Sequence, residues 1–136
     1  MSPELEAKLL GDYPLIFTCE PAGDPDELNA SAKPSPFATW GFECGDGWYD
    51  LIDSLCLNLQ HATKNGAPQV VARQVKEKLG GLRFCADGAS DEQAGMMQLA
   101  ESMSARICEV CGNRGKLLRN GGTRTRCAEH EKTDDE

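Results

Sequence analysis

Cys108-Glu109-Val110-Cys111 and, fifteen residues further on, Cys127-Ala128-Glu129-His130 form two short Cys/His pairs near the C-terminal end of the chain. Each pair aims two ligands at one point, and the intervening loop brings the pairs together, which is the arrangement of a tetrahedral zinc site. We therefore predict that Zn²⁺ is the cofactor; its four ligands are Cys108, Cys111, Cys127 and His130. A set with all four positions filled by protein indicates a structural metal, and iron in the same site is the weaker alternative.

The cellular compartment decides how the seven cysteines of this 136-residue chain are interpreted. No apolar run approaches the length of a membrane span. The first residues, Met1 to Glu6, lack the basic and apolar regions of a secretory signal. We therefore expect a reducing cytosol, where paired cysteines bind metal and the remaining ones stay free thiols. The expected free thiols are Cys19, Cys44, Cys56 and Cys85.

Charge is distributed unevenly along the chain, whose net charge is −8. Residues 1–60 carry a net charge of −9, whereas residues 105–128 carry +5. Such an acidic front and basic rear can attract each other within the molecule or form two separate binding faces.

Periodicity and capping signals predict the helices. Pro3 to Leu10 is predicted as a short helix ended by Gly11, and residues 18–38 as an acidic, proline-rich loop. Three-to-four spacing of apolar residues predicts an amphipathic helix over 47–63, with Asp46 as a candidate cap. Ser90 and Gln93 match a capping box and predict a second helix over 91–106. The face of this helix expected to point into the core holds Met96, Leu99, Ala100, Met103 and Ile107.

Residues 69–86 admit two structures. A β-hairpin centred on Gly80-Gly81 would pair Leu79 with Leu82 and place Lys78 beside Arg83. The alternative is a helix started by Pro68 and closed by Gly80, followed by one strand. Two adjacent valines favour the hairpin.

These elements combine into an α+β fold: two amphipathic helices with a β-hairpin and a C-terminal hairpin resembling a zinc ribbon or treble clef. The turn of that last hairpin is expected near Asn120-Gly121-Gly122. We predict four regions: an N-terminal helix with an acidic, proline-rich loop (1–39), an α+β core (40–107), a zinc-binding module (108–130) and a disordered acidic tail (131–136).

Two groups of basic residues are candidate binding surfaces. The first decorates the metal hairpin and could grip the phosphates of nucleic acid; it comprises Arg114, Lys116, Arg119, Arg124 and Arg126. Because the chain is acidic overall and no aromatic residue lies among these cations, base stacking is unsupported and a solvated surface is favoured. The second, a candidate anion-binding group, comprises Arg73, Lys76, Lys78 and Arg83. On a hairpin, like charges facing each other cost stability, which suggests a bound anion or an internal acid.

Enzyme hypotheses find little support, and we assign no catalytic residue. Cys56 and His61 do not share a helical face, and no base accompanies Cys44. Asp46, Asp50 and Asp53 resemble a Mg²⁺ cluster, but Asp46 is better used as a cap.

Four motifs in a fixed order suggest a relationship. They are Gly47-Trp48-Tyr49-Asp50-Leu51-Ile52, the run from Gln74 to Phe84, Met103-Ser104, and the Cys108/Cys111/Cys127/His130 set. Together, over about residues 40–130, they resemble a family of small uncharacterised zinc-binding proteins of bacteriophages and prophages. The resemblance implies a phage-type accessory protein in the cytoplasm of a bacterial host, and it supplies no activity. Segment 18–38 lies outside it.

The leading functional hypothesis is therefore a non-enzymatic accessory protein with a structural zinc that binds a host protein or a small anionic ligand. The alternative is a nucleic-acid-binding zinc module that uses the basic 114–126 hairpin, and a hydrolytic enzyme is third. No membrane partner is expected.

Overall fold

The computed structural model describes residues 1–18, 36–119 and 121–131. Both helices and strands are present, so the α+β class is confirmed. In chain order the elements are α1 (Pro3–Asp12), α2 (Pro36–Trp40), β1 (Phe42–Glu43), a 3₁₀ turn (Asp46–Trp48), α3 (Tyr49–Lys64), β2 (Val71–Lys78), β3 (Gly81–Asp87), α4 (Asp91–Ser104), β4 (Lys116–Leu118) and β5 (Arg124–Arg126).

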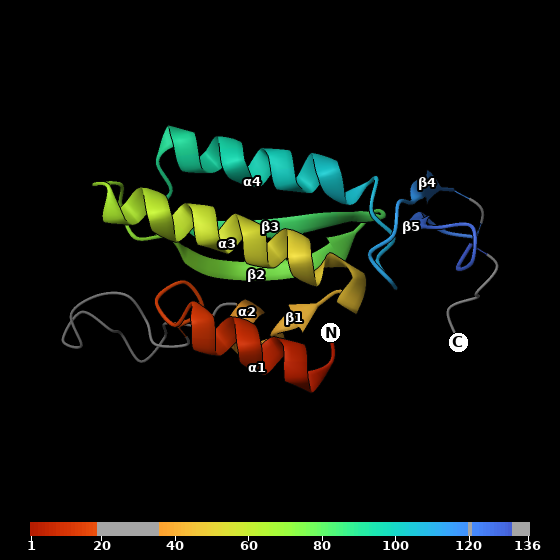
Figure 1. Cartoon of the computed structure of the whole chain (residues 1–136), viewed down its shortest axis with the longest axis horizontal. Helices are drawn as coiled ribbons and strands as arrows, with labels where there is room; N and C mark the ends of the chain where they lie inside the picture. Colours follow the sequence, from red (N-terminus) through yellow and green to blue (C-terminus); the bar gives the residue numbers. More distant parts are fainter. Residues whose placement is uncertain (19–35, 120, 132–136) are drawn as a thin grey trace.

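One three-stranded sheet, in the order β1-β2-β3, forms the centre of the molecule. Strand β1 pairs with β2 in parallel, and β2 pairs with β3 in antiparallel orientation. Helices α3 and α4 run side by side, with α4 along β3, and α1 lies near α2 and β1 (Figure 1). The two-stranded β4–β5 hairpin lies beyond the C-terminal end of α4 (Figure 1). The C-terminal hairpin is thus a separate small sheet beside the main one.

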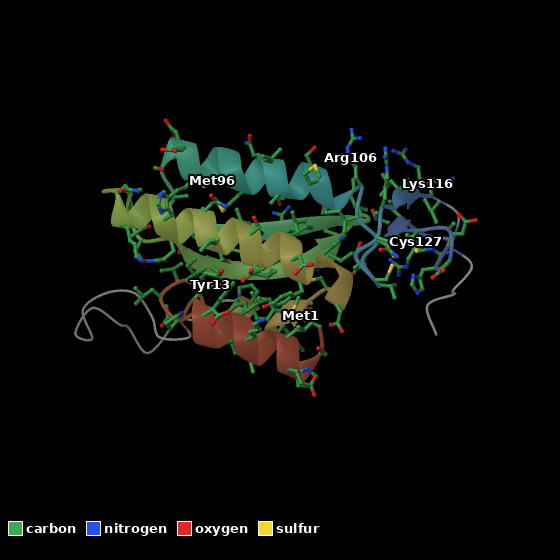
Figure 2. All side chains as sticks on the ribbon, in the orientation of Figure 1. Met1, Tyr13, Met96, Arg106, Lys116 and Cys127 are labelled. Atoms are coloured by element: carbon green, nitrogen blue, oxygen red, sulfur yellow. The ribbon has the colours of Figure 1, made fainter. Side chains whose placement is uncertain are left out.

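The hydrophobic core joins the N-terminal residues to the sheet and to α3. Phe17 packs edge-on against Phe42 at 4.9 Å between ring centroids, and Phe37 packs against Phe42 at 5.0 Å. The Tyr13 hydroxyl lies 2.8 Å from a carboxylate oxygen of Asp53 and joins α1 to α3 (Figure 2). The described part of region 1–39 therefore shares the core of region 40–107.

Residues 71–87 form the β-hairpin rather than the helical alternative, but the predicted register is wrong. Lys78 pairs with Gly81 and Lys76 with Arg83, so Leu79 and Gly80 are the two turn residues. Both have positive φ, 53° and 85°, as a type I′ turn requires. The turn is fixed here because the Gly80 carbonyl accepts a 2.6 Å hydrogen bond from the Thr125 hydroxyl, against the C-terminal hairpin.

Helix boundaries also differ from the predictions in physical detail. Helix α1 continues through Gly11 to Asp12, and α3 begins only at Tyr49, after the 3₁₀ turn. The Asp46 carboxylate accepts a hydrogen bond from the Ser2 amide at 2.6 Å, and no side chain caps α3. Helix α2 and strand β1 were not predicted. Residues 19–35 of the predicted loop, Asn120 and the tail residues 132–136 lie outside the described residues.

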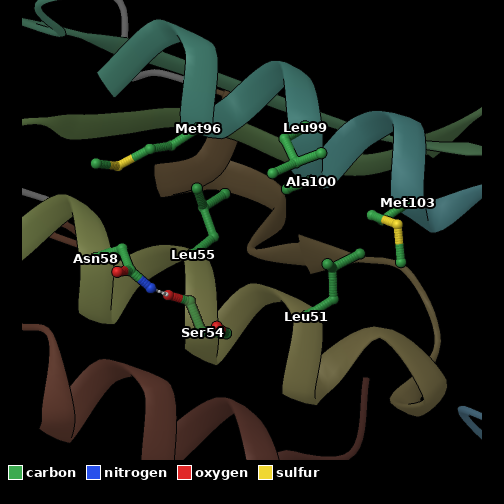
Figure 3. Close-up of a pocket in the computed structure, with 8 residues that line it drawn as sticks. All are labelled: Leu51, Ser54, Leu55, Asn58, Met96, Leu99, Ala100 and Met103. Atoms are coloured by element: carbon green, nitrogen blue, oxygen red, sulfur yellow. Dashed lines mark hydrogen bonds between the residues drawn. The ribbon is translucent and has the colours of Figure 1, made fainter. Parts of the chain in front are cut away.

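The capping box of α4 is confirmed, and its predicted core face holds at Ala100, Met96 and Ile107 but is wrong at Leu99 and Met103. The buried positions are Gln93, Ala100 and Ser104, whereas Leu99 is 66% exposed and Met103 is 40% exposed. Together with Met96 these side chains line an open groove beside α3 (Figure 3).

Polar contacts explain why α4 turns the face with Gln93, Ala100 and Ser104 inward. The buried Gln93 amide donates to the Leu59 carbonyl at 3.1 Å. At the open edge of β3, the Leu82 amide donates to the Ser104 hydroxyl at 2.8 Å, and the Phe84 amide donates to a Glu101 carboxylate oxygen at 3.2 Å. Helix α4 thus satisfies backbone donors that an edge strand would otherwise leave open.

Candidate metal centre

The four predicted metal ligands are brought to one point by two tight turns. The first turn follows α4: the Gly112 amide donates to the Cys108 carbonyl at 2.9 Å, with Gly112 in the left-handed region at φ 83°. Strand β5 then leads directly into the second turn, where the His130 amide donates to the Cys127 carbonyl at 3.1 Å.

The donor atoms have the separations that a tetrahedral metal requires. The ligand atoms of Cys108, Cys111, Cys127 and His130 all lie within 4.8 Å of one another. The Sγ atoms of Cys111 and Cys127 are 3.6 Å apart, and the His130 Nδ1 lies 3.7 Å from the Cys108 Sγ and 3.2 Å from the Cys127 Sγ. Zinc–sulfur bonds of about 2.3 Å in a tetrahedron place two sulfurs about 3.8 Å apart. The residues therefore fit a single ion, and His130 presents Nδ1 to it.

The protein environment shifts the pKa values of two of the thiols in opposite directions. Burial disfavours the charged form of Cys108, but hydrogen bonds from the backbone amides of Cys111, Cys127 and Val110 outweigh it and lower the pKa to about 6. At Cys111 the Asn113 amide lowers the pKa, yet burial and the hydrogen bonds with the Cys127 and Cys108 thiols leave it raised overall. Closely spaced thiols resist full ionisation without a cation, and a divalent metal relieves that repulsion.

A buried ion pair lies directly beside the ligands. Arg126 Nη1 is 3.4 Å from Glu109 Oε1, and both side chains are largely buried. Glu109 Oε2 also accepts a 2.9 Å hydrogen bond from the Gly45 amide. Burial raises the pKa of Glu109, and the Gly45 amide and Arg126 offset part of that rise. The carboxylate between the first two cysteines therefore fastens the metal turn to the core instead of acting as a free base.

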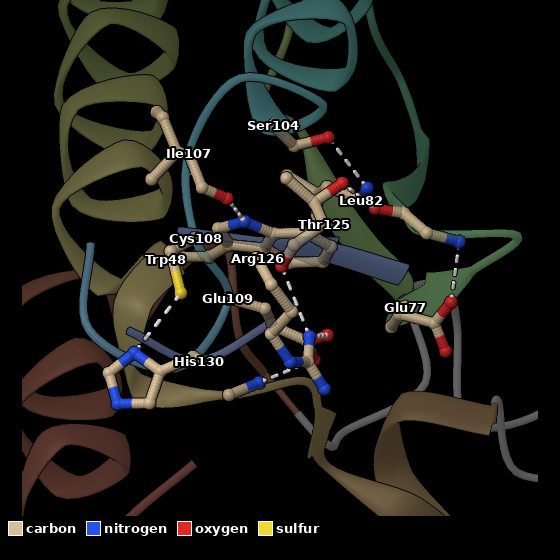
Figure 4. A network of polar contacts seen from close by, with 12 residues as sticks. Trp48, Glu77, Leu82, Ser104, Ile107, Cys108, Glu109, Thr125, Arg126 and His130 are labelled. Atoms are coloured by element: carbon tan, nitrogen blue, oxygen red, sulfur yellow. Dashed lines mark hydrogen bonds and ion pairs between the residues drawn. The ribbon is translucent and has the colours of Figure 1, made fainter. Parts of the chain in front are cut away.

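Further hydrogen bonds attach the metal turn to the start of α3 (Figure 4). The indole nitrogen of Trp48 donates to the Ile107 carbonyl at 2.8 Å, and the Gly47 amide donates to the Glu109 carbonyl at 2.7 Å. A Cβ atom at Gly47 would lie only 2.0 Å from the Cys108 carbonyl oxygen, so only glycine permits this approach. Gly47 and Trp48 are therefore the residues of the core on which the metal turn packs.

The basic residues of the C-terminal hairpin fall into two groups. Arg114, Lys116 and Arg119 are exposed. Arg124 is half-buried and donates to the Glu131 carbonyl at 3.0 Å, while Arg126 is buried in the ion pair with Glu109. Only the first three present their charges to solvent, so a nucleic-acid surface on this hairpin would be smaller than predicted.

In the candidate anion-binding group, three residues lie together and the fourth, Arg73, has an acidic partner within the protein. Lys76 and Arg83 are a cross-strand pair, with Lys78 two residues further along β2 on the same side. Arg73 sits at a β-bulge and forms an exposed 3.3 Å ion pair with Asp87. The structure brings Lys76, Lys78 and Arg83 together and assigns Arg73 an internal partner.

The thiols considered as nucleophiles are poorly placed for that chemistry. Cys44 is buried, and burial, with the Glu109 carboxylate adding to it, raises its pKa to about 12. Cys56 is fully buried, and burial raises its pKa as well, whereas His61 is exposed. Thiols held in the neutral form are weak nucleophiles.

Fold and site together define a class: an α+β protein with a Cys₃His cluster that can hold a metal ion. Comparison with known proteins gives no match, whether with family models, curated proteins or solved structures. The resemblance to phage and prophage proteins accordingly stays a prediction. Among the described residues, no helix combines enough length with enough apolar character to cross a membrane.

The residues that join the metal turn to the core were not predicted as such. Arg126 was predicted only as a nucleic-acid contact, and Gly47 and Trp48 only as part of a motif. A glycine directly before a tryptophan at a helix start was the available signal, because it suggests a close backbone approach.

Proposed function

We propose that this chain is a non-enzymatic binding protein of phage type that acts on a host protein in the bacterial cytoplasm, with a structural Zn²⁺ holding its C-terminal unit. The observation that carries the proposal is the closed donor set of three thiols and one imidazole within 4.8 Å. Three thiolates and an imidazole select zinc, and a site without an open position shapes the fold rather than activating water. The buried, neutral thiols of Cys44 and Cys56 support the non-enzymatic part.

Elemental analysis of protein purified without added metal tests the zinc. We expect one zinc per chain in the wild type and in Cys85→Ser, which changes a half-buried thiol outside the cluster. Cys111→Ser, which removes an exposed ligand without disturbing the core, should lose it. Metal-free wild-type protein, or full zinc in Cys111→Ser, would contradict the proposal.

Nucleic-acid binding is the second candidate, favoured by the exposed cations Arg114, Lys116 and Arg119. A gel shift at low salt should then weaken steeply as salt rises, and it should weaken further when these three residues become alanine. Arg124 and Arg126 are unsuitable for this test because both make contacts within the protein. Absence of any shift at low salt would exclude this candidate. A small-anion site formed by Lys76, Lys78 and Arg83 would instead be detected as binding of inorganic phosphate to the protein.

A further inference from the structure

The groove between α3 and α4 leaves large apolar side chains open to solvent at the edge of the core. It encloses about 340 Å³, and large apolar side chains from both helices line it: Leu51, Leu55, Met96, Leu99 and Met103 (Figure 3). Helix α4 buries Gln93 and Ser104 completely while leaving Leu99 66% exposed. Gln93 and Ser104 therefore serve the fold, whereas Leu99 and Met103 remain open to solvent. Contiguous exposed apolar residues of this kind mark interaction sites.

Charges of opposite sign lie at the two ends of this groove. At the N-terminal end of α4, exposed Asp91 and Glu92 line a hollow that shares Asn58 and Met96 with the groove. At the other end, exposed Arg106 follows Met103 by three residues. On the α4 side, one end of the groove is therefore acidic and the other basic, and His61 of α3 also lines the acidic hollow.

Two further cations lie beside Arg106. The Gly115 amide donates to the Arg106 carbonyl at 2.8 Å, and exposed Lys116 lies at the same end of the molecule as Arg106 (Figure 2). Arg114, also exposed, forms a β-bridge with Ile107, the neighbour of Arg106. The basic end thus carries three cations from two segments of the chain.

We propose that this groove binds one amphipathic helix of a partner protein, and that the partner helix is acidic in its first turn and basic in its last. The inference rests on the proposed binding function and names its site. The acidic turn would meet Arg106, Arg114 and Lys116, and the basic turn would meet Asp91 and Glu92. The partner helix then runs antiparallel to α4, and apolar side chains spaced i, i+3 and i+7 fill the floor.

The spacing of the charged residues on either side of the groove supports a single helix. From Glu92 to Arg106 there are fourteen residues, which span about 21 Å at 1.5 Å per residue, or about four helical turns. A second copy of this chain related by a two-fold axis would place groove against groove and leave both floors unfilled. A ridge of side chains on one helix fits a groove between two others. The two methionines are flexible enough to adapt to such a ridge.

A pair of synthetic peptides tests the proposal on the zinc-loaded full chain. Both have about fifteen residues, enough for four turns, both are stapled so that helicity is equal, and both carry leucines at i, i+3 and i+7. One has glutamates in its first turn and lysines in its last, and the other has these charges exchanged. Binding is measured by fluorescence anisotropy, with sedimentation in parallel.

Matched variants separate groove binding from general stickiness. Leu99→Ser should weaken binding of the first peptide about tenfold or more, as loss of an interface anchor does. Leu57→Ser changes a similarly exposed leucine (60%) away from the groove on α3 and should leave affinity unchanged. The charge-exchanged peptide should bind at least about tenfold more weakly than the first. Because both leucines are exposed, both variants should fold.

Methionine methyl spectra supply a second readout. On binding the first peptide, the methyl signals of Met96 and Met103 should shift, while those of Met1 and Met97, which do not line the groove, should stay in place. Equal affinity for the two peptides, equal loss in Leu99→Ser and Leu57→Ser, or no binding of either peptide would overturn the inference. So would a dimer of the wild type that Leu99→Ser dissociates. None of these outcomes bears on the structural zinc, which elemental analysis tests separately.

Discussion

The α/β core and the metal unit of residues 108–131 are held together by different forces. The core completely buries large apolar side chains, among them Trp48, Ile52 and Leu59. Within the described residues of 108–131, the buried side chains are instead Cys108, Thr125, Arg126 and Cys127. Apolar burial stabilises the first region, whereas thiols, an ion pair and hydrogen bonds stabilise the second.

This difference shows how a short segment can keep one structure without a core of its own. Units this small gain too little from apolar burial to offset the entropy of ordering their backbone, and we propose that a bound metal supplies the remainder. Hydrogen bonds through Glu109, Trp48 and Thr125 then fix where the unit sits on the core. These hydrogen bonds orient the unit, and the proposed metal would give the unit its shape.

Loss of one metal ligand should have the largest effect, and this effect should fall on the metal unit. Structural zinc contributes roughly 10–16 kcal/mol in small peptides, so Cys111→Ser should lower the free energy of metal binding by several kcal/mol, on the order of 5. Competition with a coloured chelator measures this loss. Cys85→Ser is the matched control and should bind the metal like the wild type. Equal affinity in Cys111→Ser would show that the cluster is not the binding site.

A cavity in the core should have a large effect that leaves the metal in place. Leu59 is fully buried on α3, so Leu59→Ala should reduce the free energy of unfolding by about 2–5 kcal/mol in urea titrations. Leu57, two residues earlier and 60% exposed, should cost less than about 0.5 kcal/mol when changed to alanine. Similar losses of stability in the two variants would mean that α3 does not bury Leu59 and expose Leu57 as described.

A buried thiol gives the core a dependence on alkaline pH. The pKa of Cys44 rises from its ordinary value of 9.0 to about 12 on folding, chiefly through burial. Between these values the unfolded thiol loses its proton while the folded one keeps it, so stability falls as pH rises. The slope contributed is about 1.4 kcal/mol per pH unit.

Cys44→Ala isolates this contribution. Its free energy of unfolding should decline less steeply between pH 9 and 12 than that of the wild type. Parallel curves for the two proteins would show that Cys44 is not buried in the folded state.

Local signals in the sequence predicted most elements correctly. The capping box at Ser90 and Gln93 marked the start of α4, and the glycines after Lys78 marked a hairpin. The Cys/His spacing indicated the four ligands, because it reflects chemistry confined to two turns. Each of these features depends on residues close together in the chain.

Features that depend on distant partners were not predictable in the same way. The hairpin turn is displaced by one residue because Thr125, far along the chain, binds the Gly80 carbonyl. On α4, Leu99 and Met103 were mispredicted as core residues because Gln93 and Ser104 are buried by hydrogen bonds to other elements, which apolar periodicity cannot show. Arg126 was expected on the surface because its partner Glu109 lies on another segment.

Amide hydrogen exchange with and without a chelator reports on the metal unit and the core in one sample. Metal removal should abolish protection of the hydrogen-bonded amides of β4 and β5, while those of β2, β3 and α3 should keep their protection. Unchanged protection in β4 and β5, or equal loss of protection in β2 and β5, would contradict this expectation.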